Sequence, residues 1–132
     1  MANSAIVPSS EVRSFRELVV WQEAMDLTVL VHQAAARLPQ SERFELGREM
    51  RRSATSVPSN VAEGFSRHSR KSYRLHVAIA LGSNGELQTQ LEIAQRLLYL
   101  TKEVVEDLLE RCETVARIGQ GLWRSLKPKR SR

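Results

Sequence analysis

The residues best suited to chemistry form a polar row between positions 52 and 63. Arg52, Ser56, Asn60 and Glu63 recur at intervals of four, four and three, so a helix would place them on one face. A catalytic set would need a nucleophile beside a base, paired carboxylates or metal ligands. The row therefore has to be weighed as a catalytic set, as a ligand contact, or as a polar network that holds helices together.

No catalytic set is evident around this row. His32, His68 and His76 show no spacing of three or four on a shared helical face, and Ser-x-x-Lys motifs and glycine-rich phosphate loops are absent. Cys112 is the single cysteine, which excludes an internal disulfide and a cysteine-based zinc site, and we expect it to be a small buried hydrophobe. We predict no enzyme, no metal and no cofactor.

The favoured interpretation of the row is a structural network. An antiparallel hairpin turning near Arg67 brings Arg52 opposite a later segment that carries Glu86 and Gln90. Buried polar groups require partners, so an Arg52 to Glu86 pair is expected. The predicted network consists of Arg52, Ser56, Asn60, Glu63, Glu86 and Gln90. Direct ligand contact stays open as the alternative.

Four segments with apolar residues at intervals of three and four must position these groups. The first helix enters through a Ser14 and Glu17 capping box and ends before Pro39. Its predicted inward positions are Val20, Ala24, Leu27, Val31, Ala34 and Leu38. The last two helices are expected from about Ser69 to Leu98 and from Thr101 onward. Inward positions there include Tyr73, Val77, Ala80, Leu87, Leu91, Ala94, Leu98, Leu108, Cys112, Val115, Leu122 and Leu126.

The second helix is the unusual one. Ser41 is a candidate N-cap, and the apolar face stays in phase across Pro58. We therefore predict a single helix kinked at Pro58, in which Ser53 and Ser56 can bond the carbonyls that the proline frees. Gly64 is expected to close this helix in a left-handed conformation.

Length and composition place these helices in one domain. The chain has 132 residues, of which 42% are apolar but only 5% aromatic. This predicts an all-α, antiparallel up-down-up-down four-helix bundle over residues 14–126, with a mobile arm at 1–13 and a disordered basic tail at 127–132. Apolar residues outside the inward stripes, such as Leu75, Ile79 and Leu81, suggest contact with further copies. No signal peptide or membrane-length run is present, so we expect a cytoplasmic protein without membrane contact.

Positive charge is concentrated in two runs. The first contains Arg67, Arg70, Lys71 and Arg74, and the second contains Arg117, Arg124, Lys127, Lys129, Arg130 and Arg132. They hold half of the 20 Lys and Arg, so the 15 Asp and Glu outnumber the bases elsewhere. Such segregation indicates an anionic partner. We expect the two runs to mark opposite ends of the bundle.

Several motifs resemble those of a known family. They are RRSATSVPSNVAEGFSRHS, with FRELVVWQEAMDL upstream and IALGSNGELQTQL downstream. The chain resembles the bacterial 23S rRNA intervening sequence proteins over about residues 14–126. The resemblance implies a four-helix bundle assembling as a homopentamer. It also implies similarity to the accessory protein of diversity-generating retroelements, which works with a reverse transcriptase and nucleic acid. Asn84 and Gly85 depart from the family pattern, and Asn84 puts a polar group on a central helix.

The sequence leaves two functions open. A third interpretation is that the basic residues form only a solvated surface without a partner. The first is binding of RNA or DNA through phosphate contacts with little sequence preference, since only Tyr73 is aromatic within the first run. The predicted binding residues are Arg67, Arg70, Lys71, Arg74, Lys127, Lys129 and Arg130. The alternative is a protein-interaction scaffold or an accessory subunit of a polymerase-type protein such as a reverse transcriptase, without direct nucleic-acid binding.

Overall fold

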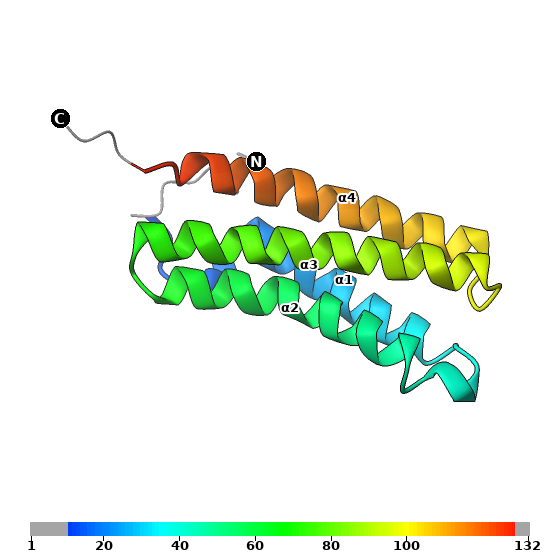
Figure 1. Cartoon of the computed structure of the whole chain (residues 1–132). Helices are drawn as coiled ribbons and strands as arrows, with labels where there is room; N and C mark the ends of the chain where they lie inside the picture. The colour runs from blue at the N-terminus through cyan, green and yellow to red at the C-terminus, as the bar shows by residue number, and fades with distance from the viewer. Residues whose placement is uncertain (1–10, 129–132) are drawn as a thin grey trace.

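The computed structural model describes residues 11–128, which form four long helices. They are α1 (Val19–Ala35), α2 (Leu46–Ser66), α3 (Arg70–Arg96) and α4 (Lys102–Ser125). Helix α1 packs against α2 and α4, and α3 packs against the same two helices. The chain direction alternates from each helix to the next (Figure 1), and the described residues contain no strand. The predicted all-α, up-down-up-down bundle is confirmed.

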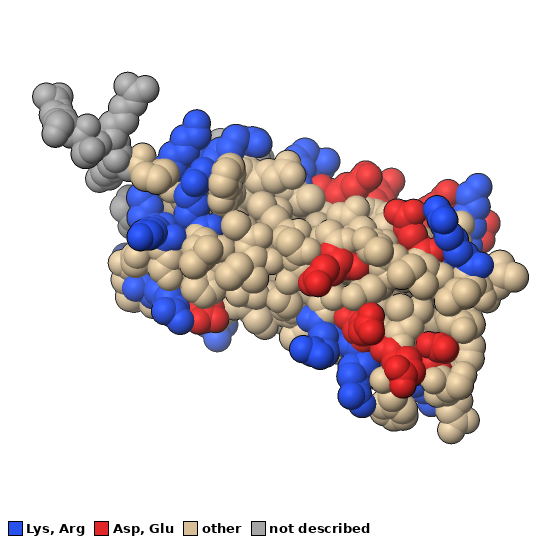
Figure 2. Space-filling model, in the orientation of Figure 1, with Lys and Arg blue, Asp and Glu red and all other residues tan. Residues whose placement is uncertain are grey.

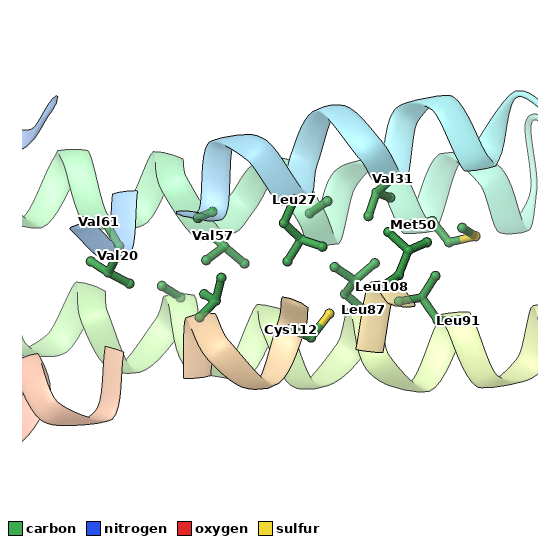
Figure 3. Packing of buried hydrophobic residues seen from close by; sticks show 14 of the residues in the cluster. Val20, Leu27, Val31, Met50, Val57, Val61, Leu87, Leu91, Leu108 and Cys112 are labelled. Atoms are coloured by element: carbon green, nitrogen blue, oxygen red, sulfur yellow. The ribbon is translucent and has the colours of Figure 1, made fainter. Parts of the chain in front are cut away.

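The inward stripes of the four helices meet in one core (Figure 3). Its fully buried side chains include Leu27, Val31, Met50, Val57, Leu87, Leu91, Val105, Cys112 and Val115. Burial raises the pKa of the Cys112 thiol to about 12, in keeping with a small buried hydrophobe. Leu98 is an exception to the predicted stripe. It is 88% exposed, because α3 ends at Arg96 and Leu98 adopts a left-handed backbone with φ 62°.

Side-chain caps fix the starts of the last two helices. The Ser69 hydroxyl accepts from the Ser72 N–H at 3.2 Å, and the Thr101 hydroxyl accepts from the Val104 N–H at 3.2 Å. These bonds satisfy backbone donors that have no partner within the helix. The predicted starts near Ser69 and after Thr101 are confirmed.

The first two helices start differently from the prediction. The Ser14 and Glu17 capping box forms, but it caps the 3₁₀ turn Phe15–Glu17, and α1 begins only at Val19. Ser41 lies inside a second 3₁₀ turn, Gln40–Glu42, so it does not cap α2. The chain after Pro39 makes successive tight turns, with Glu42 N–H to Pro39 oxygen at 2.8 Å, before α2 begins.

Helix α2 continues through Pro58, as predicted, and Pro58 is buried inside it. The proposed kink is not confirmed and stays a prediction. Proline has no N–H to donate to the carbonyl four residues earlier, which belongs to Ala54. The Thr28 hydroxyl of α1 lies 3.0 Å from the Ala54 carbonyl oxygen and 2.7 Å from the Ala24 oxygen of its own helix. The freed carbonyl is therefore reached from α1, and the expectation that Ser53 or Ser56 would bond it is wrong.

Gly64 does not close α2 as predicted. It lies within the helix, and the left-handed residue that follows is His68, with φ 56°. A Cβ at Gly64 would lie 2.8 Å from the His76 Cβ and 3.2 Å from the Tyr73 carbonyl oxygen. Glycine is required here because α2 and α3 approach each other closely.

Candidate nucleic-acid interface at one end of the bundle

The two basic runs lie at the same end of the bundle. The loop between α2 and α3 and the end of α4 are neighbours (Figure 1). Arg70 Nε donates to the Lys127 carbonyl oxygen at 2.9 Å, and Arg70 Nη2 donates to the Ser125 oxygen at 2.6 Å. The expectation of two opposite basic ends is wrong, because α4 runs in the same direction as α2 in this topology and must finish beside the loop that follows α2.

Two bases of the first run hold the end of α4. Arg70 bonds the carbonyls of Ser125 and Lys127, and Arg74 Nε donates to the Trp123 oxygen at 3.2 Å. The Arg74 guanidinium also lies 3.6 Å from the centre of the Trp123 ring. The last carbonyls of a helix have no partner within it and carry partial negative charge, so guanidinium groups are favourable there. Arg70 and Arg74 therefore contribute to the fold.

The other predicted contacts that the structure describes, Arg67, Lys71 and Lys127, are all exposed. Arg67 pairs with Glu63 at 2.7 Å, and Glu63 also lies 3.5 Å from His76 Nε2. The hydrogen bond from Arg67, with a smaller effect of His76, holds the pKa of the Glu63 carboxyl below its usual range. Within residues 11–128, Lys71 and Lys127 form no ion pair, and both are exposed. Lys129 and Arg130 lie outside the described residues.

Charge is polarised along the bundle. Figure 2 shows Lys and Arg gathered at the end where the α2–α3 loop and the end of α4 meet, while most Asp and Glu on this face lie on the other half. An anionic partner would be attracted to the first end and repelled by acidic groups on the second. On this face the basic side chains thus gather at one end of the bundle, where the sequence suggested two basic ends.

An open groove of about 950 Å³ lies at the basic end, between α3 and the end of α4. Its lining residues are Ser69, Arg70, Lys71, Ser72, Arg74, Leu75, Ala78, Trp123, Leu126 and Pro128. Trp123 lies directly before Arg124 in the second basic run and was overlooked there, and the helix topology brings it beside Arg74 of the first run. Tyr73, the aromatic residue inside that run, is buried, packs edge-on against Phe65 at 5.8 Å and is withdrawn from the surface.

The polar row is only partly the predicted network. Ser56 and Ser83 hydroxyls lie 2.8 Å apart across α2 and α3, and Asn60 Nδ2 donates to the Ser56 carbonyl at 2.8 Å and to its hydroxyl at 2.9 Å. Among the described residues Arg52 and Glu86 form no ion pair, so that expectation is wrong.

Arg52 and Glu86 instead share an open polar hollow of about 480 Å³. The hollow is lined by Glu49, Arg52, Ser53, Ser56, Ser83, Glu86 and Gln90. Because the hollow is open to solvent, water can solvate the charges of Arg52 and Glu86, and an ion pair between them would add little stability. Gln90 Oε1 is buried beside the hollow and has no hydrogen-bond partner within residues 11–128. The topology thus brings most of the predicted residues close together, but hydrogen bonds connect only some of them.

Asn84 packs within the bundle despite its polarity. The residue is 1% exposed, and its Nδ2 donates to the Cys112 carbonyl oxygen of α4 at 2.9 Å. The Asn84 side chain therefore ties α3 to α4. Its Oδ1 has no partner among the described residues.

Two other kinds of site, a metal centre and a membrane span, concern the part of the chain that the structure describes, residues 11–128. No three His, Cys, Asp or Glu side chains in this range come together as metal ligands. In the same range, no helix combines the length and the apolar character that a membrane span requires.

Comparison with known proteins gives a family and a fold. The family described as 23S rRNA-intervening sequence protein matches residues 16–121. A solved structure from the S23 ribosomal protein family of Bacteroides thetaiotaomicron, a protein of unknown function, is similar in fold, with a TM-score of 0.73 and 21% identity over 80% of this chain and 99% of that chain. No curated protein matches the sequence. With the family match spanning nearly the whole bundle, the chain belongs to the 23S rRNA-intervening sequence protein family.

Proposed function

We propose that this protein is a non-catalytic, oligomeric four-helix bundle that binds RNA or DNA through its basic end with little sequence preference. The observation that carries the proposal is the meeting of the two basic runs at one end, through Arg70 and the end of α4. Exposed Lys and Arg recognise phosphate, which is common to all nucleic-acid sequences, and clustering them raises the affinity for a polyanion.

Lys71 and Lys127 are the described residues that we expect to contact phosphate most freely, because both are exposed and neither forms an ion pair within residues 11–128. Arg67 is exposed as well, but it is paired with Glu63. Arg70 and Arg74 contribute charge from fixed positions, since both are bonded to the end of α4. Lys129 and Arg130 continue the second run in the sequence and belong to the same proposed surface.

Apolar side chains on the surface support assembly with further copies. Val29 of α1 is 53% exposed, and Ile79 and Ile93 of α3 are 44% and 42% exposed. Monomeric proteins rarely leave such residues in groups on a helix face. We propose a homopentamer, the assembly that the family resemblance implies. A ring would repeat the basic end and multiply weak phosphate contacts by avidity. A monomeric mass in solution would contradict this part.

A second candidate is a scaffold or accessory subunit for a nucleic-acid enzyme such as a reverse transcriptase. The same exposed apolar residues favour it, because they suit a protein partner as well as another copy. In this alternative the basic end aids encounter with the partner without binding nucleic acid itself. Both functions are proposed for the cytoplasm.

A salt titration separates the two candidates. The test variant is Arg67→Ala, Lys71→Ala and Lys127→Ala, which spares Arg70 and Arg74 and so spares the end of α4. The control variant is Arg37→Ala, Arg96→Ala and Lys102→Ala, which removes the same charge from exposed positions at the opposite end.

We expect binding to RNA to fall steeply with salt in the wild type. The test variant should flatten the log–log slope by up to about 3, while the control variant leaves it unchanged. No binding at low salt would favour the scaffold.

A further inference from the structure

The groove at the basic end combines an apolar floor with a cationic rim. Leu75 is 58% exposed and lines the groove with Ala78 and Trp123. Arg70, Lys71 and Arg74 supply the charge, and no acidic residue is among the lining residues. An occupant must therefore offer both a flat or apolar group and a negative charge.

The cationic groups on one side of the groove are held in place. Arg74 is fixed by the Trp123 carbonyl at 3.2 Å and by the indole ring at 3.6 Å. Arg70 is fixed by two carbonyls at the end of α4. A guanidinium has five N–H donors, so each retains donors for a phosphate. Fixed groups lose little conformational entropy when they bind, which favours affinity.

We propose that this groove is a subsite for single-stranded nucleic acid, in which an unpaired base lies against Leu75, Ala78 and Trp123 and its phosphates contact Lys71, Arg70 and Arg74. The inference rests on the proposed nucleic-acid binding and adds the strand type and the place of contact. A duplex keeps its bases stacked on one another, so only a single strand can insert a base into the groove.

Surrounding charge favours nucleic acid over an acidic peptide. Cations beyond the groove lie in the α2–α3 loop, at Arg67, and at the end of α4, at Arg124 and Lys127, which matches a polymer with one negative charge on every unit. The indole and guanidinium stack is also a planar surface, and bases of every type stack on planar groups without sequence preference. The groove therefore agrees with binding that ignores sequence.

Tryptophan fluorescence gives a direct test. The chain has two tryptophans, and Trp21→Phe leaves Trp123 as the single emitter. The probes are a single-stranded oligothymidylate of about 12 nucleotides, a blunt duplex of the same length and a glutamate-rich amphipathic peptide, all at the same salt concentration. We expect the single strand to quench Trp123 and to bind about tenfold more tightly than the duplex.

Two variants test the floor of the groove. Leu75→Asp places an acid in the groove and should abolish the single-strand advantage. Trp123→Leu, whose binding is followed by the anisotropy of labelled oligonucleotides because the emitter is lost, should reduce that advantage as well. It keeps the test valid if Leu75→Asp alters assembly. Thr89→Asp, which adds the same charge at an exposed position of α3 outside the groove, is the matched control and should keep the advantage.

Equal binding of single strand and duplex, or an unchanged Trp123 emission on binding, would overturn the groove subsite and leave the basic end as a phosphate surface. Quenching by the peptide alone would overturn it in favour of a protein partner. Absence of binding by any nucleic acid at low salt would instead overturn the proposed function itself, so the two failures are distinguishable.

Discussion

At the scale of single residues, Gly64 controls how closely α2 and α3 can pack. A methyl group there would lie 2.8 Å from the His76 Cβ and 3.2 Å from the Tyr73 carbonyl oxygen. Neither atom can swing away as the tip of a long side chain can, so the helices would have to separate. We expect Gly64→Ala to lower the free energy of unfolding by about 1–3 kcal/mol, measured by urea denaturation.

Gly121→Ala is the matched control for this change. A Cβ at Gly121 of α4 meets nothing within 4 Å, so only the helix propensity of alanine acts. We expect this variant to be more stable than the wild type by roughly 0.5–1 kcal/mol. Equal effects at the two glycines would contradict the close approach at Gly64.

The polar residues show how far single positions could be predicted. The spacing of Ser56 and Asn60 correctly placed them on one face of α2, where they bond each other. Whether Arg52 and Glu86 pair depends on how far the two side chains are from each other and from solvent, which spacing along a helix does not determine. Both line an open hollow, and water there competes with an ion pair.

At the scale of the elements, α2 tolerates its internal proline because α1 supplies a donor. Thr28 Oγ1 lies 3.0 Å from the Ala54 carbonyl that Pro58 leaves without an N–H. We expect Thr28→Val to lower the free energy of unfolding by about 1–2 kcal/mol, because it leaves this carbonyl without a partner. Thr89→Val, which removes only an exposed bond to the Gly85 carbonyl, should have a smaller effect.

A double-mutant cycle tests the same contact more sharply. Pro58→Ala restores an N–H to α2, so Thr28→Val should cost less in that background than in the wild type. Chemical denaturation of the four proteins measures the coupling free energy. Independent effects of the two substitutions would show that Thr28 does not serve the carbonyl freed by Pro58.

Helix starts were predicted correctly where a capping residue lies directly before an apolar stripe. Ser69 and Thr101 cap α3 and α4 in this way. Ser41 had the right chemistry, but the chain after Pro39 makes 3₁₀ turns, and α2 begins at Leu46. A cap signal cannot show that several tight turns intervene before the helix, because their backbone bonds depend on how the loop packs.

At the scale of the whole molecule, the order of the helices decides where charge lies. The two basic runs were each visible in the sequence, but their expected separation was wrong, because α4 returns to the end where α2 finishes. The groove beside Trp123 forms because the end of α4 packs beside the start of α3. The number of helices and their stripes could thus be predicted locally, whereas the candidate interface required the topology to be traced correctly.

The most direct measurement of the central claim is lysine footprinting of the wild-type protein. Lys71 and Lys127 lie at the basic end, whereas Lys102 lies at the start of α4 at the opposite end. The protein is treated with an amine-acetylating reagent with and without RNA, and each lysine is quantified by mass spectrometry. We predict that RNA protects Lys71 and Lys127 and leaves Lys102 reactive. Equal protection of all three lysines, or protection of Lys102 alone, would contradict a nucleic-acid interface at the basic end.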